Sequence, residues 1–173
     1  MSILSLVYAP SKILEEKAAE VKNIDNKVKE LVNNMFDTMY ENNGVGLAAP
    51  QVNESLQILV IDCSNKGNEF ESRVLINPII KNQSKIYKEY EEGCLSFPNH
   101  YFSVSRPESL LVDFIDLDGN KKERLFSGFE AVCVQHEIDH LSGTLFTAYL
   151  SRLKRQIIVK KMQKFKKNLN KSI

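Results

Sequence analysis

Two histidines four residues apart, with a glutamate directly after the first, are the most constraining feature of this sequence. They stand in the segment His136-Glu137-Ile138-Asp139-His140. Residues four apart lie on one face of an α-helix, about 6 Å apart along its axis. Two imidazoles in that arrangement can bind one metal ion, and the intervening glutamate lies near enough to take a proton from a water on that ion. The segment therefore predicts a helix that carries a metal-binding face and a general base.

The residues around this motif indicate that its helix is buried. Ser127-Gly128-Phe129-Glu130 has the spacing of a capping box, in which the serine hydroxyl and the glutamate satisfy free backbone amides. Ser142-Gly143 is a typical helix end. Val132, Val134 and Leu141 make the stretch between these signals largely apolar. We therefore expect a core helix, and buried histidines in such a helix need partners.

The apolar periodicity predicts two further helices. Asp25 precedes a stripe at steps of three and four that ends at Asn42-Asn43-Gly44, which is typical of an amphipathic helix with both caps. A second stripe predicts a helix from Leu150 to about Leu169. The first stripe consists of Val28, Leu31, Val32, Met35 and Met39, and the second of Leu153, Ile157, Ile158, Met162, Phe165 and Leu169.

Short runs of β-forming residues between the helices predict strands. We expect these strands at residues 56–61, 73–77, 85–90, 109–117 and 121–126. Asp118-Gly119 separates the last two strands and is a signal for a two-residue hairpin turn. The pattern favours an α+β fold of antiparallel strands around a central metal-binding helix, with helices at both ends.

Length, composition and cysteine content exclude several classes of protein. A chain of 173 residues is about one domain, so we expect a single domain over residues 1–173. With 43% hydrophobic and 26% charged residues and no apolar run of about 18 residues, neither a disordered chain nor a membrane protein is expected. The start Met1-Ser2-Ile3-Leu4 is not typical of a signal peptide. Three cysteines cannot all pair with one another, which favours a reducing, cytoplasmic location and no membrane partner.

The net charge of +1 hides a strong asymmetry. Residues 151–173 hold nine of the 23 basic residues and no acid, so residues 1–150 carry 14 basic and 22 acidic residues, a net charge of −8. Two interpretations of this basic C-terminal helix, at residues 150–173, stay open. Its lysines form a solvated face, or they contact an anionic partner.

A catalytic metal typically has three protein ligands, so the two histidines require a third. The candidates are Cys63, Cys94, Cys133, His100 and the carboxylates. Cys133 is seven residues from His140, about 10.5 Å of helix rise, which is too far for its short side chain. Cys63 follows an apolar strand and His100 lies in a loop with Pro and Asn, so we expect neither to be a ligand. Cys94 stands in Glu92-Gly93-Cys94-Leu95-Ser96, but spacing alone leaves it a candidate only.

A second glycine-containing stretch is Gly44-Val45-Gly46-Leu47-Ala48-Ala49-Pro50-Gln51. It has neither the ending nor the glycine spacing of a phosphate-binding loop. Its small residues allow the backbone to pass close to a substrate, and the side-chain amide of Gln51 can donate to an oxyanion. A tight loop without a binding role is the alternative.

These three segments together resemble the three signature motifs of bacterial peptide deformylases. They are Gly44–Gln51, Glu92–Ser96 and Gln135–His140, and they occur in the family's order with compatible spacing. Arg106-Pro107, the Asp118-Gly119 hairpin and the basic last helix extend the resemblance over essentially the whole chain.

The resemblance implies a role for each motif residue. It implies that Cys94, His136 and His140 are the metal ligands and that Glu137 is the acid/base residue. It further implies that Gln51 and the backbone amide of Leu95 donate to the formyl oxygen and that the Gly46 backbone binds the substrate main chain. The pocket for the first side chain, usually methionine, would be lined by Val45, Glu92, Val132 and Cys133.

The resemblance also implies the reaction and its partners. Enzymes of this family are amide hydrolases that remove the N-formyl group from nascent polypeptides and release formate, commonly with ferrous iron, for which zinc, nickel or cobalt can substitute. It implies that the basic C-terminal helix docks on the ribosome. Tyr101 departs from the family, where this position near the mouth of the site is often arginine, and Phe129 and Glu130 depart from the usual small or aliphatic pair.

Two other functions share parts of this pattern. A metalloendopeptidase has the same two-histidine helix but usually takes its third ligand from a later Glu or His, and neither occurs after His140. A structural metal module with a nucleic-acid-binding tail would need a fourth ligand to close the site.

Overall fold

The structure is a computed structural model that describes residues 2–64, 72–169 and 171. Its helices are α1 (Asn26–Glu41), α2 (Gly128–Leu141) and α3 (Arg152–Leu169), with short 3₁₀ helices η1 (Lys12–Glu15), η2 (Ala49–Val52) and η4 (Phe146–Tyr149). Its strands are β1 (Gly46–Ala48), β2 (Ile58–Ile61), β3 (Arg73–Gln83), β4 (Tyr87–Cys94), β5 (Phe97–Pro107), β6 (Ser109–Ile115) and β7 (Lys121–Ser127).

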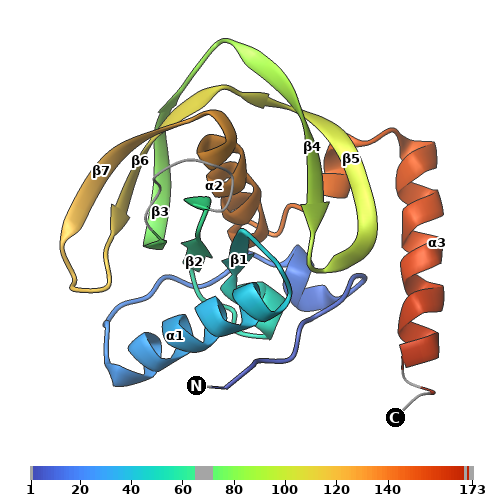
Figure 1. The fold of residues 1–173 in the computed structure, drawn as a ribbon, viewed down its shortest axis with the longest axis horizontal. Helices are drawn as coiled ribbons and strands as arrows, with labels where there is room; N and C mark the ends of the chain where they lie inside the picture. Colours follow the sequence, from blue (N-terminus) through green and yellow to red (C-terminus); the bar gives the residue numbers. More distant parts are fainter. Residues whose placement is uncertain (1, 65–71, 170, 172–173) are drawn as a thin grey trace.

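The strands form two antiparallel sheets on either side of α2. Five strands pair in the order β1-β2-β3-β6-β7, and β4 pairs with β5. Figure 1 shows α2 in the middle of the molecule, with α1 below it and α3 standing at the outer edge beside β5. The predicted α+β fold, with antiparallel strands around the motif helix and helices near both ends, is confirmed.

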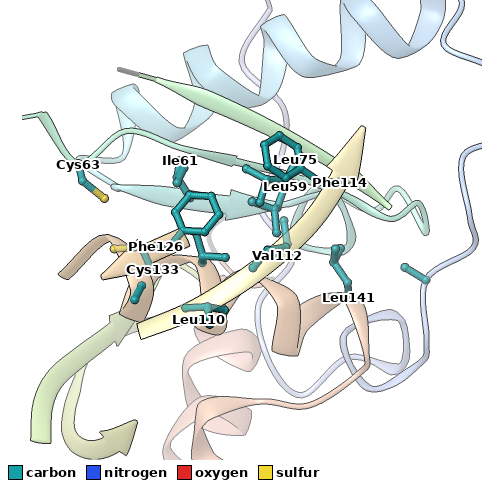
Figure 2. Close-up of a cluster of buried hydrophobic side chains, with 14 residues drawn as sticks. Leu59, Ile61, Cys63, Leu75, Leu110, Val112, Phe114, Phe126, Cys133 and Leu141 are labelled. Atoms are coloured by element: carbon teal, nitrogen blue, oxygen red, sulfur yellow. The ribbon is translucent and has the colours of Figure 1, made fainter. Parts of the chain in front are cut away.

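Two of the apolar clusters among the described residues hold the large sheet against α1 and α2, and a third packs α3 against β5. One packs the inner face of the large sheet against α2 and includes Leu59, Leu75, Val112 and Phe126, all fully buried (Figure 2). The other packs the buried stripe of α1 against β1, β2 and β3. Because α2 is covered by apolar side chains on the side of the large sheet, its two histidines are fixed in position with respect to the strands.

The first helix forms as predicted. The carboxylate of Asp25 accepts a hydrogen bond of 3.0 Å from the backbone amide of Val28, which is the expected N-cap. At the other end the left-handed residue is Asn43, with φ of 54°, and not Gly44. Asparagine tolerates this conformation better than most residues, so the chain leaves α1 without needing the glycine.

The motif helix has the predicted bounds, but the predicted capping box is wrong. Ser127 makes no side-chain capping bond, and the carboxylate of Glu130 turns inward instead. Its oxygens lie 3.6 Å from Arg73 Nε and 3.5 Å from Arg124 Nη2. Two guanidinium groups at this position attract the carboxylate more strongly than one backbone amide does.

The predicted two-residue hairpin is also wrong. Ile115 pairs with Lys121, so five residues connect β6 and β7. The Asp116 carboxylate organises this wider loop by accepting hydrogen bonds from the backbone amides of Asp118 and Asn120, at 3.0 and 2.8 Å. A side chain that satisfies two loop amides makes the longer connection stable.

The other strands differ from the prediction mainly in length. β3 continues to Gln83 and β4 continues to Cys94, whereas β1 and β5 were not predicted at all. The first part of β5 contains Pro98 and Asn99, residue types that usually argue against a strand. His100, expected in a loop, therefore lies within β5.

The last helix spans Arg152–Leu169, and only part of its apolar stripe is covered. Ile158 and Met162 are fully buried, whereas Leu153 is 68% exposed and Ile157 is 47% exposed. Lys166 donates a hydrogen bond of 2.7 Å to the carbonyl of Pro10. Along the described part of the chain, none of the helices has the length and apolar character needed to cross a membrane.

Candidate active site

Three potential metal ligands meet between the end of β4 and one face of α2. Cys94 is the last residue of β4, and His136 and His140 lie one turn apart on α2. One ligand atom from each lies within 4.8 Å of the other two, and Cys94 Sγ is 3.2 Å from His140 Nε2. One sulfur and two nitrogens at these separations fit around a single ion with bonds of about 2.0–2.3 Å, with one position left for a further ligand.

The two histidines differ in their electrostatics. Burial lowers the pKa of His136, but hydrogen bonds with Cys94 and Glu92 outweigh it and raise the pKa well above its usual value. His140 is completely buried, and this burial, together with the charges on His136 and Arg106, lowers its pKa well below the usual value. A histidine must be neutral to bind a metal, so His140 is already in the right form at neutral pH.

The other two cysteines lie away from this cluster. Figure 2 shows Cys63 and Cys133 in the apolar cluster beside Ile61 and Phe126. A hydrogen bond between the two thiols, followed by burial, raises the pKa of Cys133 far above its usual value, so it stays a neutral thiol. His100 instead has its Nδ1 at 2.8 Å from the carbonyl of Pro98. Of the candidates for the third ligand that lie in the described part of the chain, the structure brings only Cys94 to the two histidines.

A buried ion pair supports His136 from behind. The Nδ1–H of His136 donates to Glu92 at 2.8 Å, and Arg106 donates to both oxygens of the same carboxylate, at 2.5 and 2.9 Å. Burial alone would raise the pKa of Glu92, but the hydrogen bonds from Arg106 and His136 outweigh it and hold the pKa below its usual value. The ionised carboxylate fixes the orientation of the ring and leaves Nε2 facing the cluster.

This role of Glu92 differs from its predicted place in the pocket wall. The residue borders the cavity, but its carboxylate is used by His136 and Arg106. No motif in the sequence assigns a role to Arg106. Its partner Glu92 is 14 positions away and is brought to it by the pairing of β4 with β5, which no local signal reveals.

Glu137 lies next to the cluster, and one of its carboxylate oxygens is available to a ligand. The side chain is buried, and its Oε2 has no hydrogen-bond partner among the described residues. Burial raises its pKa to about 7. A carboxyl group with a pKa near neutrality can both accept and donate a proton at physiological pH.

Gly46 makes room for this carboxylate. A Cβ atom placed on Gly46 would stand 2.5 Å from Glu137 Oε1, closer than side-chain atoms can approach. The glycine in β1 therefore allows the backbone of the strand to lie directly against Glu137.

Gln51 is oriented by the short helix that follows β1. Its Oε1 accepts a hydrogen bond of 2.8 Å from the backbone amide of Ala48. The opposite end of the amide, Nε2, therefore faces the cluster, 3.5 Å from Cys94 Sγ and 3.3 Å from Ser96 Oγ. Leu95 lies in the turn between β4 and β5, directly after the cysteine.

A cavity of about 650 Å³ opens beside the cluster. It is lined by all five residues predicted for the substrate pocket, Val45, Gly46, Glu92, Val132 and Cys133, and also by Phe129, His100 and Tyr101. Leu6 and Tyr8 complete it from the N-terminal segment, a contribution that no sequence motif signals. Tyr101 is 64% exposed, and its ring lies over Gly93, where a Cβ would come within 2.6 Å of Cε1. The volume suits a ligand the size of a short peptide end.

Comparison with known proteins gives one consistent result. The model of the family described as polypeptide deformylase matches residues 3–156. The peptide deformylase of Pelagibacter ubique is 41% identical over 168 residues, which cover 97% of this chain and 98% of the relative. The crystal structure of a peptide deformylase from Legionella pneumophila superposes with a TM-score of 0.89 at 43% identity and covers 98% of both chains. That of the Ehrlichia chaffeensis peptide deformylase in complex with actinonin has a TM-score of 0.90 at 39% identity, with 95% of this chain and 98% of the other covered. With its three motifs gathered around one cavity and these similarities over nearly its full length, the chain belongs to the polypeptide deformylase family.

Proposed function

We propose that this protein is a metal-dependent amide hydrolase that removes the formyl group from the N-terminal formyl-methionine of newly synthesised polypeptides and releases formate. The observation that carries the proposal is the cluster of Cys94, His136 and His140, of which Cys94 and His136 line the cavity together with Glu137. We place this activity in the cytoplasm, where nascent chains are made.

Cys94, His136 and His140 are the ligands in this proposal, and the donor set suits several divalent ions. One thiolate and two imidazoles accept iron, zinc, nickel or cobalt, and we assign Fe²⁺ as the ion in the cell. A divalent ion held there polarises a carbonyl group and lowers the pKa of a water molecule.

Glu137 moves the proton. Its unpartnered Oε2 accepts a proton from the attacking water, and the raised pKa lets the same group return that proton to the leaving amine. Gly46 keeps the carboxylate in place because its backbone lies against Oε1 without a side chain between them.

Gln51 and Leu95 stabilise the oxygen that becomes negative during the attack. Gln51 Nε2 faces Cys94 because its Oε1 is held by Ala48. The backbone amide of Leu95 is the second donor in this proposal. Donors aimed at a developing oxyanion typically contribute about 3–4 kcal/mol each.

The cavity supplies the substrate specificity. Val45, Val132 and Cys133 form an apolar wall for the methionine side chain, and the backbone of Gly46 binds the peptide main chain. A formyl carbon carries only hydrogen, so a narrow space beside Gly46 excludes the larger acetyl group by size.

The proposal is tested by purifying the protein without oxygen, measuring its metal content and comparing two substrates. We expect one divalent ion per chain, rapid release of formate from formyl-Met-peptides and no release of acetate from acetyl-Met-peptides. Internal cleavage of the peptide would instead indicate an endopeptidase, and a metal-loaded protein without either activity would contradict the proposal.

We also propose that α3 docks the enzyme on ribosomal RNA, near the point where its substrate emerges. Among its basic residues, Arg155 and Lys166 bind backbone carbonyls of the protein body. The others that lie in the described part of the helix are exposed, namely Arg152, Lys154, Lys160, Lys161, Lys164 and Lys167. This surface is a charged face available for an anionic partner, and the alternative is that it is only solvated.

A further inference from the structure

A chain of hydrogen bonds runs from the molecular surface to the inner face of α2, and its outer half lies outside the site described above. Tyr149, the last residue of η4, donates its hydroxyl to Asp139 Oδ2 at 2.7 Å. The same oxygen accepts from Arg106 Nη1 at 2.8 Å. Arg106 in turn holds Glu92 with its Nε and Nη2, and Glu92 accepts from His136 Nδ1.

The guanidinium of Arg106 serves two carboxylates, and the tyrosine adds a neutral hydrogen-bond donor to one of them. Two carboxylates, those of Glu92 and Asp139, share the single guanidinium of Arg106, which is only 3% exposed. The hydroxyl of Tyr149 supplies Asp139 with an additional donor. Burial and the neighbouring Asp139 raise the pKa of Tyr149 to about 12, so the hydroxyl keeps its proton and remains a donor.

The tyrosine also contacts the guanidinium directly. The Cζ of Arg106 lies over the ring of Tyr149, 4.8 Å from its centroid, and Nη1 is 3.5 Å from the hydroxyl oxygen. Arg106 is therefore held on one side by Glu92 and on the other by Asp139 and Tyr149. A guanidinium fixed on both sides has one orientation, and that orientation sets the position of the Glu92 carboxylate.

We propose that Tyr149 is a positioning residue for His136 and that it acts through Asp139, Arg106 and Glu92. The inference rests on the proposed role of His136 as a metal ligand. With the hydroxyl present, Asp139 stays at Arg106 Nη1, the guanidinium stays aimed at Glu92, and the imidazole keeps Nε2 directed at the cluster. Without it, Asp139 is free to turn to solvent and the ring of His136 is held less firmly.

The position of Tyr149 is itself set by the basic helix. Arg155 of α3 donates hydrogen bonds to the backbone carbonyls of Thr147 and Ala148, at 3.1 and 2.8 Å. These two residues belong to the same short helix, η4, as Tyr149. The hydrogen bonds thus connect α3, the proposed docking element, to a proposed metal ligand.

The test is Tyr149→Phe in the full chain loaded with zinc. This change removes only the hydroxyl and keeps the ring over Arg106, and the side chain is 49% exposed, so no buried cavity forms. Loss of a direct partner of a metal-bound histidine typically weakens metal binding about 10–100-fold. Since Tyr149 acts at a distance, we expect a smaller loss, roughly 3- to 10-fold in zinc affinity measured by chelator competition. We also expect a shifted or broadened NMR signal of the His136 Nδ1 proton, and a lower kcat at unchanged KM.

Tyr87→Phe is the matched control, because Tyr87 is a tyrosine of β4 with similar exposure, 55%. It should leave zinc affinity and the His136 signal unchanged.

If Tyr149→Phe does not fold, Asp139→Asn breaks the same chain one step further in and should weaken zinc binding in the same direction. Wild-type zinc affinity and an unchanged His136 signal in the folded variant would overturn the inference and leave the proposed function intact. A wild-type chain that bound no zinc would overturn the metal assignment itself, and with it this inference.

Discussion

At the scale of single residues, the proposed chemistry depends on the space that a glycine leaves in β1 and on polar atoms that have no other partner. Glu137 Oε2 has no hydrogen-bond partner among the described residues, and its Oε1 fits against β1 because the residue there, Gly46, has no side chain. Cys94 faces the histidines, while Cys63 and Cys133 face the apolar cluster. Each of these differences can be tested by one substitution.

Gly46→Ala should reduce turnover strongly while the metal stays bound. The new Cβ would stand 2.5 Å from Glu137 Oε1, so the carboxylate has to move away from its position. We expect a loss of at least about 10²-fold in kcat/KM, the low end for general acid–base catalysis. Formate release and metal content are measured on the same sample, and turnover close to that of the wild type would show that the carboxylate does not need this position.

Cys94→Ser should lose the metal or the activity, whereas Cys63→Ser and Cys133→Ser should retain the metal. The reason is that only Cys94 has its sulfur at the histidine pair. Elemental analysis of the three purified variants checks this expectation, with the two buried cysteines as the matched controls. A Cys94→Ser variant with a full complement of metal, together with metal loss in Cys133→Ser, would reverse the assignment.

The sequence could predict some of these residues and not others. The histidine pair was evident because its two members lie one helical turn apart. Cys94 is 46 positions from His140, so spacing could not select it, and only the resemblance to a family did. No sequence motif marks Arg106 or Tyr149. Strand pairing brings Glu92 to Arg106, and the turn after α2 brings Tyr149 to Asp139.

At the scale of secondary-structure elements, α1 and α2 begin in different ways. The Asp25 carboxylate caps α1 through the amide of Val28. Ser127 caps nothing with its side chain, and Glu130 is drawn to Arg73 and Arg124 instead. Asp25 and Ser127 both look like N-caps in the sequence, but only the side chain of Asp25 stabilises the start of its helix.

Asp25→Ala should destabilise the protein more than Ser127→Ala. Removing a working N-cap costs about 1 kcal/mol, whereas an exposed side chain without a structural role changes stability by no more than about 0.5 kcal/mol. The free energy of unfolding in urea, measured for both variants without metal, separates the two cases. Equal losses would mean that the hydroxyl of Ser127 contributes to α2 after all.

The prediction of elements succeeded where the pattern of side chains is regular. The stripe of α1 repeats at helical steps from Val28 to Met39, about three turns, and predicts the helix between its caps Asp25 and Asn42. The prediction missed β5 because pairing with β4 on both sides of Pro98, Phe97 with Cys94 and residues 101–107 with 87–93, overrides the local preference of this proline. Tertiary pairing of this kind is not visible in one strand alone.

At the scale of the whole molecule, opposite charges are separated between the body and the last helix. The net charge of −8 over residues 1–150 contrasts with nine basic residues in 151–173. Since Ile158 and Met162 are buried against the body, cutting the chain before them exposes apolar surface as well as removing charge. Charge substitution therefore tests the docking proposal better than truncation does.

Changing Lys160, Lys164 and Lys167 to Glu should abolish ribosome binding and leave activity on free formyl-peptides intact. All three side chains are exposed, so the fold does not depend on them. In the wild type, affinity should fall by roughly 0.7–0.9 log unit per log unit of salt for each phosphate contacted. The same substitution at the exposed Lys22, Lys27 and Lys29 is the control, since it changes the net charge equally near α1. If both triple variants bound ribosomes like the wild type, the basic face would be only solvated.

The central claim is that Glu137, beside a metal held by Cys94, His136 and His140, carries the proton in deformylation. Its most direct test compares formate release from a formyl-Met-peptide by the wild type and by Glu137→Gln, each shown to hold one metal ion per chain. We predict that Glu137→Gln keeps its metal and fold but loses at least about 10²-fold in rate, because glutamine cannot accept the proton. A metal-loaded Glu137→Gln variant with near-normal turnover would contradict it.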